Sequence, residues 1–337
     1  MVKEALCSYF KMCPDRSALA IEKRSFVGLG SPGVHYYRFI IADEKVKHSA
    51  FGKTTHKNEA EYQALQYITK TIPEEQRNTT RPIALLKNGA HSLLLLEDLN
   101  RYSSPLSVTN SLWLFPNRSR SIIEIGKNLV DSIYGLQRHC EVAYSLLSFE
   151  DIDDVPGQPL PTSIFKQLES IRSIESSTKA ALRRSIDAII SNGTAVRRGL
   201  VHGQLGLRNI MTRQSKIVFI DWEYMRAAGL CIFDPCYMAV MILMRSVQLF
   251  LRRPDLEKIS ESLFAHIEFC EERLAPPDKK RCVQDAVWFA KCIAMIDTLW
   301  QYERSHRKLL SGLLAQVDRK SRYLVYEIET IAKRRKG

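Results

Sequence analysis

The sequence predicts a two-lobed α+β fold with a β-rich N-terminal lobe and an α-rich C-terminal lobe, and three observations lead to this class. The 337 residues, 45% of them hydrophobic, can bury a core large enough for one big domain or two lobes. Strand-like segments gather in the N-terminal third, whereas helical periodicities dominate the rest. We therefore expect a helical N-terminal extension over residues 1–20, an N-lobe over 21–100 and a helical C-lobe over 101–337.

The N-lobe elements follow from runs of β-branched and aromatic residues between polar turns. Residues 34–41 and 46–51 are strand-like, and residues 92–96 form a short apolar run. Residues 58–69 repeat apolar side chains every three positions among charged ones, which is the period of an amphipathic helix. The expected order is strand, strand, strand, helix, strand, strand.

The C-lobe elements are mainly amphipathic helices. Helical periodicity extends over residues 121–139, 163–191, 255–274 and 282–302. An acidic, proline-containing loop spans residues 150–161, and a short β-like pair covers 209–212 and 217–220. We therefore expect a helical lobe interrupted by one small hairpin.

Composition argues against export and membrane insertion. The N-terminus mixes charges into its few apolar residues, unlike a secretory signal. The longest apolar run, 237–244, is less than half of the roughly 20 residues needed to cross a bilayer. The eight cysteines include no CxxC pair and no zinc-type spacing, so they are typical of reduced core thiols. We expect a cytoplasmic protein without a membrane span.

The net charge of +12 is the one unusual bulk property, and it favours anionic partners. Part of the excess lies in the terminal run Lys333–Lys336, and a solvated basic surface would also explain it. Since the chain contains no standard nucleic-acid module, nucleic-acid binding is the weaker hypothesis. The oligomeric state leaves no signature in the sequence.

The strongest functional signal is LVHGQLGLRNIM at 200–211, followed by VFIDWEY at 218–224. This pair resembles the HGDxxxxN and IDWE signatures of the aminoglycoside phosphotransferase and choline kinase superfamily, which implies a protein-kinase-like fold binding ATP and Mg²⁺. The resemblance makes residues 200–224 the catalytic loop region and places His202 in the loop itself. It also gives Asp234, in the segment Phe233-Asp234-Pro235, a role in supporting that loop.

Asn209 and Asp221 are the candidate metal ligands. Phosphoryl transfer from ATP needs Mg²⁺ on the phosphate oxygens, and Mg²⁺ prefers hard oxygen donors such as an amide and a carboxylate. An apolar strand that ends in Asp221 would direct the carboxylate toward those phosphates. The alternative is that Asp221 only caps a turn.

Three glycines and an ion pair are the candidate phosphate contacts in the N-lobe. Gly28, Gly30 and Gly33 form a GxGxxG pattern before a strand rather than a helix, which favours a kinase phosphate loop over a Rossmann turn; a plain hairpin is the alternative. In such folds a lysine, here Lys53, holds the α- and β-phosphates and a glutamate, here Glu61, orients it.

Lys47 and Glu59 are rival candidates for these two roles. The apolar run before Glu97 and Leu99 resembles the hinge between kinase lobes, where main-chain groups bind adenine; a plain buried strand fits the same residues.

Gln204 occupies the position where the superfamily has its catalytic aspartate. An amide is far too weak a base to accept the acceptor's proton, and it also carries an N–H donor. Without a general base, the rate of transfer is lower by a factor of about 10² to 10⁴. Three explanations stay open: a pseudokinase acting as a nucleotide-binding regulator or scaffold, an active enzyme with another base such as Glu223 or a carboxylate in 150–154, or a deliberate replacement.

The expected acceptor is a small hydroxylated molecule. The basic chain argues against cationic aminoglycosides and fits an anionic acceptor better. Trp288, Trp300 and Tyr302 could form a cage for choline-like cations, although aromatics at helical spacing are more often core.

Overall fold

The structure is a computed structural model. It describes residues 1–24, 35–55, 57–89, 91–99, 118–140, 142–148, 150–153, 164–213, 216–306 and 311–334. Most of the acidic loop 150–161 and the last two residues of the basic run Lys333–Lys336 lie outside these ranges.

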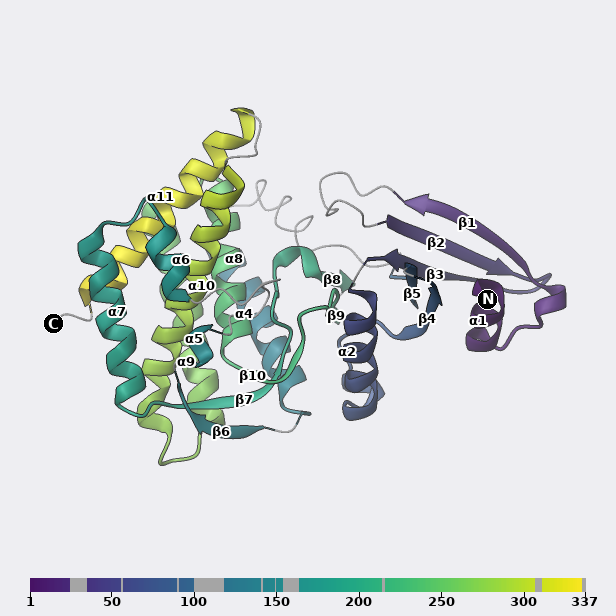
Figure 1. The fold of residues 1–337 in the computed structure, drawn as a ribbon, viewed down its shortest axis with the longest axis horizontal. Coiled ribbons are helices and arrows are strands. Elements are labelled where there is room, and N and C mark those ends of the chain that lie inside the picture. Colours follow the sequence, from purple (N-terminus) through teal and green to yellow (C-terminus); the bar gives the residue numbers. More distant parts are fainter. Residues whose placement is uncertain are drawn as a thin grey trace. The chain divides into compact units, whose positions relative to one another are not determined.

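The chain divides by its internal contacts into two units (Figure 1). The first comprises residues 1–105 and 209–225, and the second comprises 106–208 and 226–337. This division differs from the expected domains because residues 209–225 belong with the N-terminal sheet. The segment 200–224, expected to lie within one lobe, is therefore shared between the two units.

The first unit is built on a five-stranded antiparallel sheet with the order β1-β2-β3-β5-β4. Its strands are β1 (Ala18–Arg24), β2 (His35–Ala42), β3 (Lys47–Thr54), β4 (Pro82–Asn88) and β5 (His91–Glu97). Helix α2 (Asn58–Thr71) follows β3 in the chain. The predicted order of three strands, a helix and two strands is confirmed.

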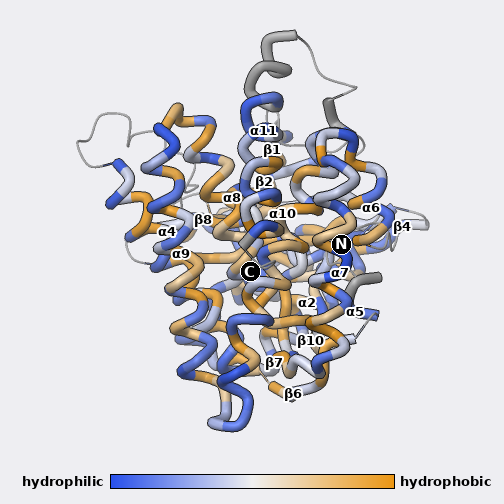
Figure 2. The backbone as a smooth tube through the Cα atoms, turned by 90° about the vertical axis from the view of Figure 1, so that its left-hand side faces the viewer, coloured by the Kyte–Doolittle hydropathy of each residue, from blue (hydrophilic) through white to orange (hydrophobic). Residues whose placement is uncertain are grey.

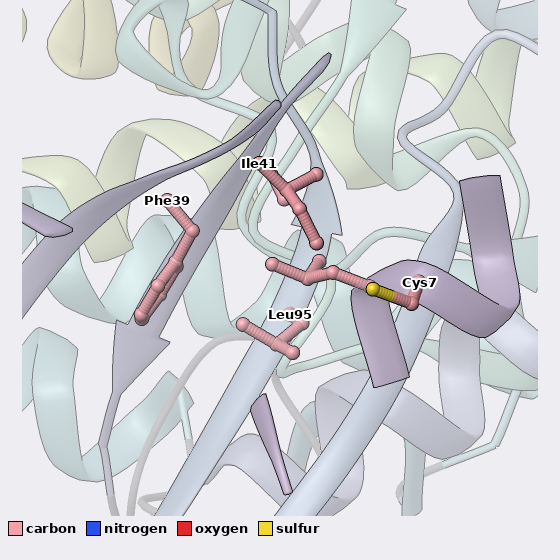
Figure 3. Packing of buried hydrophobic residues seen from close by; sticks show 6 residues of the cluster. Cys7, Phe39, Ile41 and Leu95 are labelled. Carbon is pink, nitrogen blue, oxygen red and sulfur yellow. The ribbon is translucent and has the colours of Figure 1, made fainter. Parts of the chain in front are cut away.

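Helix α1 (Val2–Phe10) packs on the same sheet. Leu6 and Cys7 are fully buried, and Figure 3 shows Cys7 beside Ile41 and Leu95 of β2 and β5. The chain then passes through a 3₁₀ turn and enters β1 at Ala18, so the expected boundary at residue 20 falls inside a strand. The N-terminal helix is thus part of the sheet's core.

A short hairpin, β8 (Ile210–Arg213) and β9 (Lys216–Phe219), also belongs to the first unit and covers the predicted β-like pair. The Phe219 backbone N–H donates to the Asn78 carbonyl at 2.8 Å, which ties the hairpin to the chain leading into β4. This tie positions the residues at both ends of the hairpin.

The second unit is mainly helical, and the predicted α+β class is confirmed. Its helices are α4 (Arg118–Gln137), α5 (Glu150–Asp153), α6 (Ile164–Ser170), α7 (Ser176–Ser191), α8 (Phe233–Gln248), α9 (Arg253–Leu274), α10 (Val283–His306) and α11 (Ser311–Arg334). Helix α8 is buried along almost its whole length, whereas α4 and α9 alternate hydrophobic and hydrophilic stretches (Figure 2). Among the described residues, no helix is long and apolar enough to cross a membrane.

Two features of this unit differ from the sequence prediction. The helix expected over 163–191 is interrupted between α6 and α7, where the Glu303 carboxylate accepts the backbone N–H of Arg172 and Ser173 at 2.9 and 3.1 Å. The second unit also contains a three-stranded antiparallel sheet that the sequence did not predict. Its strands lie in the order β10-β7-β6 and are β6 (Ala143–Leu146), β7 (Ala195–Val201) and β10 (Arg226–Leu230).

A buried charged network joins β7 to the helices around it. Arg197 bonds the Glu271 carboxylate at 3.0 Å and the Gln137 amide oxygen at 3.1 Å. The Gln137 amide nitrogen in turn donates to the Cys231 carbonyl at 2.8 Å. The side chains of Arg197 and Glu271 are only 3% and 7% exposed, so this ion pair belongs to the core.

Candidate active site

Three carboxylates in the first unit meet at one ammonium group. Lys53, on β3, donates to the Glu61 carboxylate of α2 at 2.9 Å and to the Asp221 carboxylate that follows β9. The Glu223 carboxylate lies 3.8 Å from the same Nζ atom. Side chains as far apart in the chain as Lys53 and Glu223 thus converge on a single ammonium group.

The position of Lys53 is fixed by the start of α2. Asn58 is fully buried, and its amide nitrogen donates to the Lys53 carbonyl and to the Ser92 carbonyl, both at 2.9 Å. These bonds hold the end of β3, the start of α2 and the start of β5 together. Glu61, three residues further along α2, is thereby placed beside Lys53.

The hairpin β8–β9 brings the two candidate metal ligands to the same end. Ile210 pairs with Phe219, and beyond this pair the Ile220 N–H donates to the Asn209 carbonyl at 2.9 Å. Asp221 follows directly with a positive φ of 69°, a conformation that aspartate tolerates better than most residues. Asn209 and Asp221 are therefore neighbours across the mouth of the hairpin, with oxygen donors suited to Mg²⁺.

The lysine stays charged although it is buried. Burial by itself lowers the pKa of an ammonium group, but Glu61 and then Asp221 raise the pKa of Lys53 above its ordinary value. Burial also raises the pKa of Glu61, and the contact with Lys53 opposes that change. Burial raises the pKa of the Tyr36 hydroxyl as well, opposite Lys53 on β2, so this phenol is neutral at physiological pH.

The carboxylates outnumber the cations in this cluster. A second ammonium, Lys57, lies 3.6 Å from Glu223 and 3.4 Å above the Tyr224 ring. Three carboxylates against two ammonium groups leave one negative charge in excess. The Asp221 side chain is 31% exposed, whereas those of Glu61 and Lys53 are 1% and 8% exposed, so the aspartate is the most exposed member of the cluster.

The second unit holds the turn that follows β7. Both oxygens of the buried Asp234 carboxylate accept backbone N–H bonds, from His202 at 2.6 Å and from Gly203 at 3.1 Å. Gly203 has a φ of 86°, which only glycine adopts without strain. Asp234 therefore holds this turn in its conformation, and burial raises its pKa to about 7 despite the two N–H donors.

Gln204 is half-buried at the end of the same turn. Its backbone N–H donates to the His202 Nδ1 atom at 3.4 Å, which requires a lone pair there and places the proton of a neutral imidazole on Nε2. The Gln204 carbonyl also accepts the Gly206 N–H at 2.9 Å. The backbone at position 204 is thus held by its neighbours on both sides.

The remaining predicted site residues are the three glycines of the phosphate loop and the two residues of the hinge. Gly28, Gly30 and Gly33 lie outside the described residues. At the predicted hinge, Glu97 ends β5 and its N–H donates to the Arg81 carbonyl at 3.0 Å, so the sheet already uses this amide; Leu99 follows two residues later. Their adenine contacts stay a prediction.

The rival residues lie elsewhere. Lys47 is exposed at the start of β3, and Glu59 forms a surface ion pair with Lys87 at 2.9 Å. Sequence reasoning did not identify Asn58, although a polar residue at the start of a helix signals a local backbone contact. It considered Glu223 only as an alternative base and not as a partner of Lys53.

No protein-family model and no curated protein matches the sequence. Among solved structures, the chain is similar to a thermostable mutant of aminoglycoside phosphotransferase APH(4)-Ia, with 11% identity, 99% of each chain covered and a TM-score of 0.48.

Two further solved structures are similar over nearly the full length. For a putative fructosamine-3-kinase from Haemophilus somnus 129PT, identity is 14%, 97% of this chain and 96% of the other are covered, and the TM-score is 0.48. For choline kinase LicA from Streptococcus pneumoniae, identity is 12%, coverage is 98% of both chains, and the TM-score is 0.46.

Proposed function

We propose that this chain binds ATP and Mg²⁺ and transfers the γ-phosphate of ATP to a hydroxyl group of a small acceptor, at a rate limited by Gln204. The observation that carries the proposal is the convergence of Glu61, Asp221 and Glu223 on Lys53. The three carboxylates exceed what is needed to balance the charge of the buried Lys53. One of them could therefore bind a metal ion, and the ammonium could bind a phosphate oxygen in its place.

The residues present fit a magnesium ion. Asn209 and Asp221 provide an amide and a carboxylate oxygen at one end of a hairpin, and the surplus negative charge favours a cation there. When bound, Mg²⁺ would neutralise charge on the phosphate oxygens of ATP. Asp221 would then hold the metal in place of Lys53, and Lys53, still paired with Glu61, would be available to bind a phosphate oxygen.

Gln204 explains why transfer would be slow. Its amide oxygen can accept a hydrogen bond from the acceptor hydroxyl and so orient it, but the amide cannot take the proton. Phosphoryl transfer depends mainly on positioning and electrostatics, so loss of the base lowers the rate without abolishing transfer. Asp234, which fixes the backbone of His202 and Gly203, acts as a positioning residue for this turn.

A cluster of cations in the second unit supports an anionic acceptor. Arg208 follows Gln204 by four residues, and its charge acts on Lys320 of α11 together with that of Arg245 on α8. Burial, together with the charges of Arg245 and Arg208, lowers the pKa of Lys320 to about 8. A carboxylate or phosphate on the acceptor would relieve this repulsion, so we propose a hydroxylated acceptor bearing such a group.

The first experiment measures ATP turnover and nucleotide binding with Mg²⁺. The variant Gln204→Asp should raise turnover by about 10² or more, and Asp221→Ala should abolish both turnover and Mg²⁺-dependent nucleotide binding. Glu59→Gln serves as a control that should leave both measurements unchanged, because Glu59 lies on the same helix as Glu61 but pairs with Lys87. If Gln204→Asp leaves an already active protein unchanged, position 204 is not that of the base.

The second candidate function is a pseudokinase that binds nucleotide and acts as a regulator or scaffold, which Gln204 itself favours. It predicts a thermal shift with ATP and Mg²⁺ without turnover in either the native protein or Gln204→Asp. Absence of any nucleotide binding would contradict both candidates.

The anionic acceptor has its own test. Lys320→Met should weaken binding of inorganic phosphate in calorimetry and raise the melting temperature, because it removes a buried charge between two arginines. If phosphate binds equally to both proteins, the cation cluster does not form the acceptor site.

A further inference from the structure

Apart from the proposed active-site residues, α4 and α9 bring together three side chains that commonly bind metals. Asp131 lies on α4, and His266 and Cys270 lie four residues apart on one face of α9. The two helices pack side by side (Figure 2). Each residue therefore directs one candidate ligand atom into the space between the same two helices.

The three ligand atoms are close together. The His266 Nε2 and Asp131 Oδ1 atoms are 2.8 Å apart, and Cys270 Sγ lies 3.6 Å from Asp131 Oδ1 and 3.8 Å from His266 Nε2. All of them lie within 4.8 Å of one another, the one group of this kind among the described residues. They form a compact triangle of sulfur, nitrogen and oxygen.

The dimensions of this triangle fit a tetrahedral metal. Zinc bonds of about 2.3 Å to sulfur, 2.1 Å to nitrogen and 2.0 Å to oxygen place ligand atoms about 3.3 to 3.6 Å apart at tetrahedral angles. The two distances from sulfur agree with this range to within a few tenths of an ångström. The shorter nitrogen–oxygen distance is the hydrogen bond that a metal would replace.

We propose that Asp131, His266 and Cys270 form a binding site for a transition-metal dication of the zinc type, with water in the fourth position. Thiolate and imidazole select zinc, cobalt or nickel over magnesium and calcium. The Asp131 side chain is 56% exposed, which gives the ion access from solvent, whereas Cys270 is 8% exposed and closes the inner side of the site.

Binding at this site would connect α4 to α9. The Cys270 thiol releases its proton to solvent as the sulfur–metal bond forms, and neutral His266 and ionised Asp131 supply the other two bonds. Since the ligands lie on two helices of the second unit, metal binding stabilises the folded form of that unit. The site is independent of the proposed kinase activity.

The sequence could not reveal this site from cysteine and histidine spacing. Asp131 and His266 are 135 positions apart, and a His and a Cys four apart on a helix are an ordinary helix face. Only the packing of α4 against α9 supplies the third ligand.

Cobalt(II) titration of the metal-free 337-residue protein tests the proposal. We expect one equivalent to give a thiolate-to-cobalt charge-transfer band and the visible bands of four-coordinate cobalt, both removed by zinc. Cys270→Ser should lose the charge-transfer band, and His266→Ala or Asp131→Asn should weaken binding by at least about tenfold. Cys282→Ser, which changes a cysteine on another element, should bind as the native protein does.

Melting curves of each variant without metal show whether it is folded. A folded native protein without the charge-transfer band overturns the proposal, as does a band that survives in Cys270→Ser. Asp221→Ala should bind cobalt normally, so failure of the proposed kinase function and failure of this site would be distinguishable.

Discussion

The two units each bury a charged cluster, and the clusters differ in charge balance. In the helical unit, Arg197 and Glu271 pair one to one, and the Gln137 amide oxygen accepts a further hydrogen bond from the guanidinium. In the sheet unit, Lys53 is surrounded by three carboxylates, of which Asp221 is 31% exposed. A balanced, fully buried pair serves the fold, whereas an unbalanced and accessible cluster indicates a binding site.

The largest effect is expected from breaking the balanced pair. Glu271→Ala leaves the buried Arg197 without its counter-ion, which should lower the free energy of unfolding by about 3 to 5 kcal/mol. Chemical denaturation measures this loss, with the exposed neighbour variant Glu272→Ala as control. A loss below about 1 kcal/mol would show that the pair is not essential to the core.

The next effect concerns the buried Asp234. Its folded pKa of about 7 exceeds the ordinary 3.8, so the folded state retains this proton to higher pH than the unfolded state. The stabilisation it contributes is complete below pH 3.8 and is lost as the pH rises through about 7. Asp234→Asn cannot titrate and costs about 1 to 3 kcal/mol through a lost acceptor.

Urea denaturation of the native protein and of Asp234→Asn at several pH values measures this pH-dependent contribution to stability. The difference in unfolding free energy between native protein and Asp234→Asn should shrink as the pH rises through this range, by at most about 1.4 kcal/mol per pH unit. A difference that grows with pH would mean that the two N–H donors hold the carboxylate ionised throughout.

A smaller effect is expected at the unbalanced cluster. Asp221→Asn removes one of three carboxylates around Lys53, and it should change the free energy of unfolding by less than about 1 kcal/mol because Glu61 and Glu223 still compensate the ammonium. The same variant should lose Mg²⁺-dependent nucleotide binding in a thermal-shift titration. A destabilisation as large as that of Glu271→Ala would make the two clusters equivalent and remove the contrast.

The smallest effect is expected on the surface of α2. Glu59 and Lys87 are 2.9 Å apart, the same distance as Lys53 and Glu61, but their side chains are 58% and 53% exposed. Glu59→Gln should therefore change stability by less than about 0.5 kcal/mol in a thermal or urea melt. A larger loss would show that distance matters more than burial in this protein.

Much of the fold was predictable because it follows from local patterns. The order of strands and α2 in the first unit, the β8–β9 hairpin and most of the long helices agree with the periodicities of the sequence. Strand β7 was missed because Arg197 and Arg198 interrupt its apolar pattern. Each arginine has a partner that is distant in the chain: Arg197 pairs with Glu271, and Arg198 bonds Asp151.

The candidate site was predictable only in part. Motif spacing singled out Lys53, Glu61, Asn209 and Asp221, and the structure places these four in one unit. The participation of Asn58 was not visible, because its two hydrogen bonds run to backbone groups that the sequence does not place.

The sequence by itself thus determined the strands and α2 of the first unit, the β8–β9 hairpin and most of the long helices, and it singled out Gln204 at the position that the resemblance assigns to a base. Only the tertiary structure decided that α1 completes the core of the sheet, that residues 209–225 join the first unit, and that Asp131 meets His266 and Cys270. The physical reason is the distance along the chain over which each kind of information acts. Periodicity records the side of an element that is buried, whereas packing between elements distant in the chain decides which polar groups meet there.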